Sequence, residues 1–204
     1  MPRPPLSLDP ATTAALFIEA QNGIVGPQSV IPDLRAAAVP ALPFMGRLAA
    51  GFRAAGAKVF HLTYQPTLEL RSSNRKPPLL QYTLPAMKDW TLGHPATQPI
   101  DEIGLEPGDI LLPRFSGMSP TANTEIFPML RNAGFTTVVL AGVSVNVAMP
   151  VVATNAADEG FDVIVPRDAV AGTPVEYAES VLRHTMPVLA RVSTTEEVLA
   201  ALVG

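Results

Sequence analysis

One stretch of this sequence, residues 136–172, limits the fold more than any other. It opens with an apolar, β-branched run that breaks at Gly142, continues through an irregular turn into an Ala-rich segment, and reaches Gly160. A second apolar run, at 163–165, begins soon after that glycine. This order predicts strand, turn, helix and strand, which form a βαβ unit with parallel strands and a right-handed crossover.

The strands of this unit are expected to be buried on both faces. The first carries Val138, Val139 and Leu140 in unbroken succession, without the polar alternation of a half-exposed strand. Continuous apolar strands are typical of a doubly wound parallel sheet with helices on both sides. Ligands bind such sheets beyond the carboxyl ends of the strands, so we expect the functional site at the turn 142–148.

The remaining sequence supplies further strands and helices for one domain that spans residues 1–204. The chain is long enough for one sizeable core and too short for two. Pro-rich residues 1–12 predict an extended surface arm. Residues 65–107 have many prolines and little periodicity, which predicts a lid or subunit-contact segment with one or two short helices. Apolar patterns predict strands at 14–18, 58–64, 109–113 and 190–193, and helices at 42–55, 121–132, 174–189 and 195–202.

Composition narrows the expected partners and location. Apolar residues make up 48% of the chain and charged residues 16%, so we expect further copies to cover part of its surface, in a homodimer or homotetramer. A net charge of −4 without basic runs argues against nucleic acid binding. No apolar run approaches the roughly 18 residues that cross a bilayer, and the first residues lack an apolar signal core. We therefore expect a cytoplasmic protein that contacts neither nucleic acid nor membrane.

The chain has no cysteine, which excludes disulfides, thiolate metal sites and catalysis by a thiol. An acid, Glu19, stands directly after the apolar run 14–18, at the carboxyl end of a predicted strand. A carboxylate in that position is costly to bury without a function. Glu19 is therefore a candidate catalytic group, and a structural carboxylate that caps the exit loop is the alternative.

Four segments, in their order and spacing, resemble those of the isochorismatase-like (cysteine hydrolase) superfamily. Glu19–Asn22 stands where the family has Asp-x-Gln-Asn, and Gly142–Ala148 stands where it has Gly-Val-x-Thr-Asn-x-Cys. Thr124–Phe135 and Phe161–Ala169 are similar to the helix before and the strand after that turn. The resemblance implies a three-layer α/β fold with a six-stranded parallel sheet of order 3-2-1-4-5-6. It also implies that the exit loops of the first and fourth strands face one pocket.

The sequence departs from the family at all three positions of the Asp, Lys and Cys triad. The acid is Glu19, and Ala148 stands at the cysteine position. Counting from the third strand puts the lysine position at Arg114, whereas counting back from Thr124 puts it at Phe115; we favour Arg114 because a cation belongs there. A single engineered change would have left the Asp and Lys in place, so the three departures together favour natural divergence.

The partner of Glu19 decides which chemistry it can perform. Arginine stays protonated and offers a planar fork, so Arg114 can clamp a carboxylate or a substrate anion but cannot shuttle a proton. Paired with Arg114, Glu19 would be held ionised and would suit a base or a binding group. Unpaired in an apolar pocket, it would suit a general acid. Some isochorismatases lack the cysteine and hydrolyse a vinyl ether with the acidic residue as proton donor.

Further residues are expected to line the pocket. Tyr64, Phe115, Met118 and Trp90 could form an apolar wall, and the predicted substrate-binding set is Asn22, His61, Tyr64, Phe115, Ser144, Val147 and Ala148. For His61, a satisfied buried histidine is an equal alternative, and Asn146 could cap the following helix. The resemblance also implies a cis peptide at Val143–Ser144 and backbone N–H groups near Val147 and Ala148 that form an oxyanion hole.

Two functions remain open on the sequence alone. The first is a cysteine-independent hydrolase that acts on a small polar metabolite of amide or enol-ether type. The second is a pseudoenzyme that keeps the pocket as a small-ligand binding or scaffold protein. Metal-binding relatives carry an Asp-x-His pattern and a further His after the second strand, and Gln65–Thr67 offers no such ligands. We therefore predict no metal and no cofactor.

Overall fold

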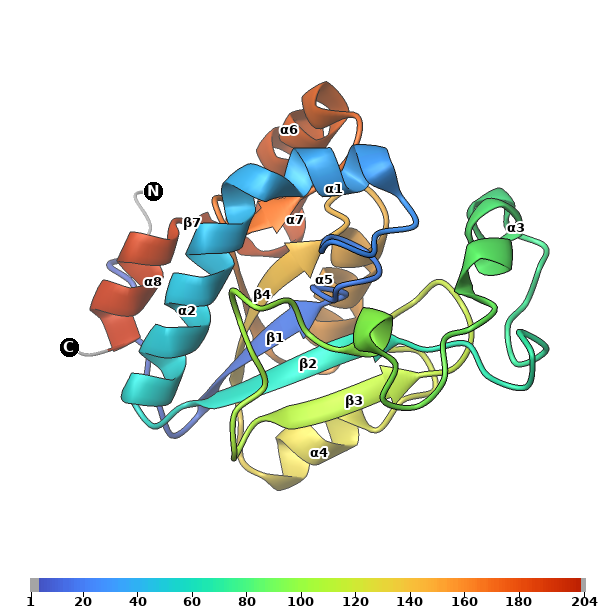
Figure 1. Cartoon of the computed structure of the whole chain (residues 1–204). Coiled ribbons are helices and arrows are strands. Elements are labelled where there is room, and N and C mark those ends of the chain that lie inside the picture. Colours follow the sequence, from blue (N-terminus) through green and yellow to red (C-terminus); the bar gives the residue numbers. More distant parts are fainter. Residues whose placement is uncertain (1–3, 203–204) are drawn as a thin grey trace.

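The computed structural model describes residues 4–202 and contains one parallel sheet between two layers of helices (Figure 1). The strand order is β3-β2-β1-β4-β5-β7, with the two-residue β6 beside the end of β4. This confirms the predicted order, because β7 is the sixth strand expected from the sequence; β6 was not predicted. The strands are β1 Thr13–Ile18, β2 Lys58–Tyr64, β3 Ile110–Arg114, β4 Thr137–Val143, β5 Asp162–Pro166, β6 Val170–Ala171 and β7 Arg191–Ser193.

The helices divide between the two faces of the sheet. One face carries α1, α2 and α8, and the other carries α4 to α7. Short 3-10 turns occur at Val39–Ala41, Leu84–Met87 and Pro95–Thr97. The helices are α1 Pro32–Ala38, α2 Leu42–Ala54, α3 Pro78–Thr83, α4 Ile126–Asn132, α5 Ala148–Asp158, α6 Val175–His184, α7 Met186–Leu189 and α8 Thr195–Leu202.

Strand β1 lies at the centre and feeds both cores. All six of its residues are buried. Phe17 packs with Leu48 and Phe52 of α2 on one face, whereas Leu16 packs with Met149 of α5 on the other. Each such side chain contributes about 1.5–3 kcal/mol by leaving water. The double burial is the arrangement that the continuous apolar strands predicted.

Gly142 allows β4 to lie tightly against β1. It pairs with Ile18 in the parallel register, has a φ of +107°, and a Cβ there would collide with the Ile18 carbonyl oxygen. Only glycine adopts this conformation readily and leaves room for the neighbouring backbone. The two strands therefore end side by side, which brings Glu19 next to the turn 143–148.

The helices of the structure differ from the predicted ones in three places. The predicted helix 121–132 begins only at Ile126, because residues 121–125 form turns in which the Thr124 hydroxyl donates to the Thr121 carbonyl. The predicted helix 174–189 is divided into α6 and α7 at Thr185. Pro187 has no N–H with which to continue the hydrogen bonding of α6. Helix α1 was not predicted.

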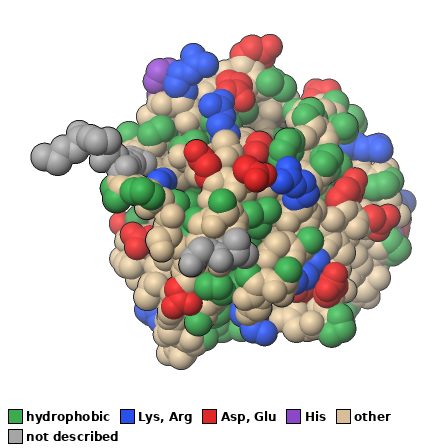
Figure 2. Space-filling model, turned by 90° about the vertical axis from the view of Figure 1, so that its left-hand side faces the viewer, with side chains coloured by type: hydrophobic (Ala, Val, Ile, Leu, Met, Phe, Trp, Pro, Cys, Tyr) green, Lys and Arg blue, Asp and Glu red, His purple; other side chains and the backbone are tan. Residues whose placement is uncertain are grey.

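The two segments outside the regular pattern differ in structure. Of the predicted arm 1–12, residues 1–3 lie outside the described part, and the Leu8 N–H donates to the Ala201 carbonyl at 3.1 Å. The segment 65–107 carries α3, which projects from the body of the molecule (Figure 1). Figure 2 shows acidic, basic and apolar side chains interspersed on the face near the chain ends. No helix within residues 4–202 is long and apolar enough to cross a membrane.

Candidate active site

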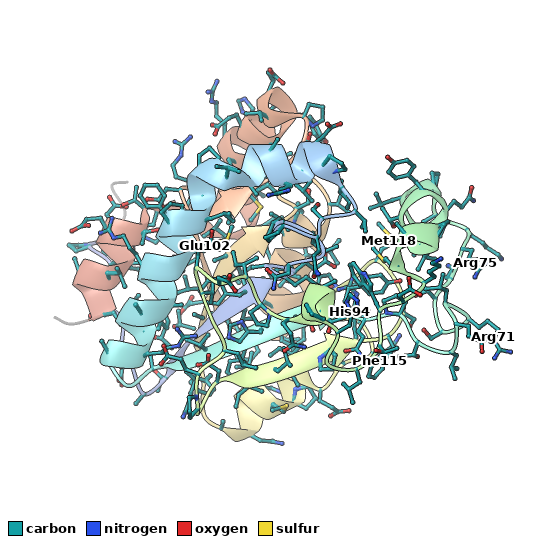
Figure 3. The ribbon with its side chains drawn as sticks, viewed as in Figure 1. Arg71, Arg75, His94, Glu102, Phe115 and Met118 are labelled. Atoms are coloured by element: carbon teal, nitrogen blue, oxygen red, sulfur yellow. The ribbon has the colours of Figure 1, made fainter. Side chains whose placement is uncertain are left out.

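A cavity of about 160 Å³ lies where β1, β2, β3 and β4 end. Its floor is formed by the exit loops of these strands, and its walls come from α1 and α3. The residues with polar side chains are Glu19, Tyr64, Thr83, Arg114, Ser144, Asn146 and Thr173. The apolar lining residues are Ile24, Ile31, Leu34, Leu79, Leu80, Met87, Met118, Val147 and Ala148. Met118 lies beside α3 in Figure 3, while Arg71 and Arg75 lie at the outer edge of the 65–107 segment.

Glu19 and Arg114 form an ion pair in this cavity. Glu19 follows β1 with a φ of +50°, and its N–H donates to the Leu62 carbonyl at 2.9 Å. The Arg114 Nη2 contacts the Glu19 Oε1, and both side chains are largely buried. The structure thus places Arg114 against the acid and leaves Phe115 outside the cavity lining.

Tyr64 supports the arginine from the neighbouring strand. It pairs with Arg114 in the β2–β3 register, and the guanidinium carbon lies 4.7 Å from the centroid of its ring. This is the geometry of a cation–π contact. Burial raises the pKa of the Tyr64 phenol, although its hydrogen bond with Ser73 and the nearby Arg114 act in the opposite direction. Tyr64 therefore serves as a neutral platform under Arg114.

Gln21 fixes the position of Tyr64 and was not predicted as a site residue. Its fully buried side chain accepts from the Tyr64 N–H at 2.7 Å and donates to the Tyr64 carbonyl at 3.0 Å. It also donates to the Ala96 carbonyl at 3.0 Å, which ties the 65–107 segment to the same point. The signal that could have revealed this role was its place in the Glu19–Asn22 segment, where the family has Asp-x-Gln-Asn.

The turn between β4 and α5 forms the opposite wall. The Val143–Ser144 peptide is cis, as the family resemblance implies. The Ser144 hydroxyl donates to the Asn146 side-chain oxygen, and the Asn146 amide donates to the Thr173 carbonyl at 2.8 Å. Asn146 thus braces the turn against the loop after β6 and does not cap α5, whose N-cap is Val147.

Of the two candidate oxyanion-hole amides, one is already engaged. The Val147 N–H donates to the Ser144 carbonyl at 3.1 Å. Ala148 is the first residue of α5, and its N–H has no acceptor among residues 4–202. Its side chain is only 3% exposed and lines the cavity. The Ala148 amide therefore carries the partial positive charge of a free helix N-terminus.

Three predicted binding residues are not brought to the cavity. Asn22 turns toward the 65–107 segment, where its amide donates to the carbonyls of Pro95 and Pro99 at 3.3 Å. Phe115 lies one residue beyond Arg114, so its side chain points elsewhere and is 45% exposed. His61 lies in the middle of β2 and packs its ring on Phe17 beneath α2.

His61 belongs instead to a buried polar cluster away from the cavity. Its Nε2 lies 3.1 Å from Asp109 Oδ2, and the same carboxylate accepts from Arg53 at 2.6 Å. Burial lowers the pKa of His61, and the carboxylate of Asp109 offsets this only in part. Burial alone would raise the pKa of Asp109, but hydrogen bonds from Arg53, the Glu106 N–H and His61 outweigh it and lower the pKa. His61 is thus a buried histidine whose Nε2 is hydrogen-bonded, as the alternative expected, while its Nδ1 has no partner among the described residues.

Several cavity residues could not be found from the sequence. Leu34 comes from the unpredicted α1 and Ile31 directly precedes that helix, while Leu79, Leu80, Thr83 and Met87 come from the 65–107 segment. Neither stretch has enough periodicity to define which side chains face inward. No group of three or more His, Cys, Asp or Glu side chains within residues 4–202 is arranged to hold a metal ion.

Comparison with known proteins identifies the family. A profile of the Isochorismatase domain matches residues 13–197. The chain belongs to the isochorismatase family. This isochorismatase-family chain is 31% identical to the uncharacterized family protein YecD of Escherichia coli O157:H7 over 205 residues, which cover 97% of this chain and all of YecD. It is 29% identical to the ureidoacrylate amidohydrolase RutB of Methylobacterium radiotolerans over 167 residues, which cover 71% of this chain and 61% of RutB.

Solved structures of the isochorismatase family share the fold. A family protein from Burkholderia thailandensis superposes with a TM-score of 0.80 at 24% identity, covering 98% of this chain and all of that one. A cysteine hydrolase from Pseudomonas syringae pv. phaseolicola gives a TM-score of 0.83 at 18% identity, covering all of this chain and 99% of that one. The family is one of hydrolases, and this member has no cysteine.

Proposed function

We propose that this isochorismatase-family chain hydrolyses a small amide-type metabolite without a cysteine nucleophile, with Glu19 as general base. The observation that carries the proposal is the Glu19–Arg114 pair, which lies in the same cavity as Ala148. The family's acid and cation have counterparts in Glu19 and Arg114, although Ala148 stands at the position of the cysteine. The 29% identity to a protein named an amidohydrolase supports an amide-type substrate.

In the proposed step, ionised Glu19 accepts a proton from water while the water oxygen bonds to the substrate carbonyl carbon. The charge that develops on the carbonyl oxygen is stabilised by the Ala148 N–H at the start of α5. The intermediate then expels the amine, which takes the proton from Glu19, and the acid and amine products leave. Arg114 acts on Glu19 by holding its carboxylate in place through the ion pair between the ends of β1 and β3.

The ion pair favours amide hydrolysis over enol-ether hydrolysis. Cleavage of an enol ether needs a protonated acid to donate to the substrate, as expected for an unpaired Glu19. The Glu19 carboxylate is instead paired with Arg114, and this arrangement suits a base better than a proton donor. Between the two chemistries open from the sequence, the amide type is therefore our choice.

Glu19→Gln tests this proposal. A panel of small amides is screened with the wild-type protein, and the amide that turns over is then used for the variants. We expect Glu19→Gln to lower kcat by about 10²–10⁴-fold, the usual contribution of a general base. Glu176→Gln, the same change at an exposed site in the first turn of α6, should leave turnover unchanged. Full activity of Glu19→Gln with an unchanged circular dichroism spectrum would refute the mechanism.

A binding protein without turnover is the second candidate. It is favoured by Ala148 in the place of the nucleophile and by the Ser144 hydroxyl, which is bound to Asn146. In that case no amide in the panel is hydrolysed, and Glu19→Gln changes ligand affinity only modestly. The small-molecule partner, the cytoplasmic location and the association into dimers or tetramers remain predictions.

A further inference from the structure

The charges that line the cavity cancel. Glu19 and Arg114 are the two lining residues with ionised side chains, and they are paired with each other. A carboxylate ligand would approach Arg114 only by displacing Glu19 or by lying next to its negative charge. A cationic ligand would likewise approach Glu19 only by displacing Arg114 or by lying next to its positive charge. Like charges at close range in a poorly solvated site disfavour binding.

Most neutral polar side chains of the cavity are also engaged in hydrogen bonds. The Tyr64 hydroxyl bonds to Ser73, and the Thr83 hydroxyl donates to the Leu79 carbonyl at 2.9 Å. The Ser144 hydroxyl is bound to Asn146. Two further nitrogens of Arg114, Nε and Nη1, lack partners but are fully buried, so a ligand cannot reach them without rearrangement. What remains for a ligand is the Ala148 N–H, the Thr173 hydroxyl, which has no hydrogen bond among the described residues, and the lone pairs of Glu19.

The walls themselves are aliphatic. Nine of the sixteen lining residues are Ile, Leu, Met, Val or Ala. The one aromatic lining residue, Tyr64, is buried, and the Arg114 guanidinium lies over its ring, so that face is not available for stacking. The volume of about 160 Å³ is close to the roughly 150 Å³ of an apolar cavity that holds one benzene molecule.

We propose that this cavity selects an uncharged ligand with a compact aliphatic body and a single carbonyl group. The inference rests on the proposed function in taking this cavity as the substrate site, and it adds the substrate class. The aliphatic body would contact Leu34, Leu79 and Leu80, and the carbonyl oxygen would accept from the Ala148 N–H. Charged metabolites such as carboxylates are disfavoured, although Arg114 is present.

Three ligands of equal shape and different charge test the selection. Cyclopentanecarboxamide, cyclopentanecarboxylate and cyclopentanecarboxamidinium are titrated into the full-length protein at pH 7, with binding followed by calorimetry or ligand-observed NMR. We expect the carboxamide to bind about tenfold or more tightly than either ion. Benzamide, whose planar ring finds no free aromatic face, should bind more weakly than cyclopentanecarboxamide.

Two variants test the cause of the selection. In Glu19→Gln the charge of Arg114 is uncompensated, so cyclopentanecarboxylate should gain affinity and overtake the carboxamide. Leu79→Gln, at the cavity wall, should weaken the carboxamide, whereas Leu92→Gln, at an exposed site outside the lining, should not. The inference is overturned if the carboxylate binds the wild-type protein as tightly as the carboxamide does. It is also overturned if none of the ligands binds with a Kd below about 10 mM.

Binding and turnover separate this inference from the proposed function. Binding of the carboxamide without hydrolysis of any amide would retain the selection and refute the hydrolase. Hydrolysis that depends on Glu19 but prefers anionic amides would retain the hydrolase and refute the selection.

Discussion

Gly142 shows how one residue without a side chain sets the geometry of the site. Its positive φ and its approach to the Ile18 carbonyl both depend on the missing Cβ. We expect Gly142→Ala to lower the free energy of unfolding by about 3 kcal/mol or more, since strain and a backbone clash add together. Urea denaturation followed by fluorescence of the single Trp90 measures the change.

Gly160 provides the matched control for this prediction. It has a similar positive φ of +87°, but a Cβ there would meet no atom within 4 Å. Gly160→Ala therefore isolates the conformational cost, about 1–2 kcal/mol. Equal losses for the two variants would contradict the claim that the β1–β4 approach requires glycine at 142.

At the scale of elements, the His61–Asp109–Arg53 cluster joins β2, the entry to β3 and the end of α2 (residues 42–54). Arg53 also donates to the Ile103 carbonyl at 2.8 Å, so the cluster anchors the return of the 65–107 segment. His61 meets the charged groups Asp109 and Arg53 from these elements, while β1 contributes the uncharged ring of Phe17. The cluster therefore links stability to pH.

The sign of that link follows from the two pKa shifts. The pKa of His61 is lowered in the folded protein, so below about pH 6.5 the unfolded chain binds more protons than the folded one. The free energy of unfolding therefore decreases as the pH is lowered. The pKa of Asp109 is also lowered, so its contribution is present above about pH 4 and is lost as pH falls further. We expect His61→Gln to flatten the pH dependence of unfolding between about pH 6.5 and 5, without removing the loss below pH 4. Parallel curves for the two proteins from pH 7 to 5 would refute this role.

Elements with a clear apolar period were predictable, and those set by local chain chemistry were not. The strand 58–64 and the helix 195–202 match β2 and α8 to the residue, because their apolar spacing is unambiguous. Helix α1 has only seven residues, of which Pro32 is the first, and these are too few to show a period. The break between α6 and α7 depends on one proline within an otherwise continuous helical pattern.

For the whole molecule, the topology of the sheet made part of the site predictable. Parallel strands end at one edge, so Glu19 after β1 and the turn after β4 were expected to face one pocket. Arg114, at the end of β3, was expected there from the family's lysine position, and Glu19, Arg114 and Ala148 do line one cavity. The positions of His61, Asn22 and Phe115 depend instead on side-chain direction, which the chain order alone does not fix. The cavity walls from the 65–107 segment depend on tertiary packing of an aperiodic stretch.

Restoring a thiol tests whether the cavity still presents the geometry of the cysteine hydrolases. Because the chain has no cysteine, Ala148→Cys carries a single thiol. At the start of α5 its thiolate would be stabilised by the helix N-terminus. We expect faster alkylation by iodoacetamide at pH 7 than for Ala190→Cys, which lies outside the cavity before β7, together with a gain of amide hydrolysis. Equal alkylation rates would show that the helix N-terminus does not activate this position.

The sequence also predicts association into dimers or tetramers, and the projecting 65–107 segment is the candidate subunit contact. Tyr82 on α3 is 72% exposed and Leu92 is 82% exposed, so both offer apolar surface to a contact between copies. If this segment forms the subunit contact, Tyr82→Asp should lower the mass measured by size-exclusion chromatography with light scattering. Tyr177→Asp, on the exposed side of α6 (residues 175–184), serves as the control and should leave the mass unchanged. A monomeric wild-type protein would refute the association, whereas an oligomer unaffected by Tyr82→Asp would place the contact elsewhere and leave α3 as a wall of the cavity alone.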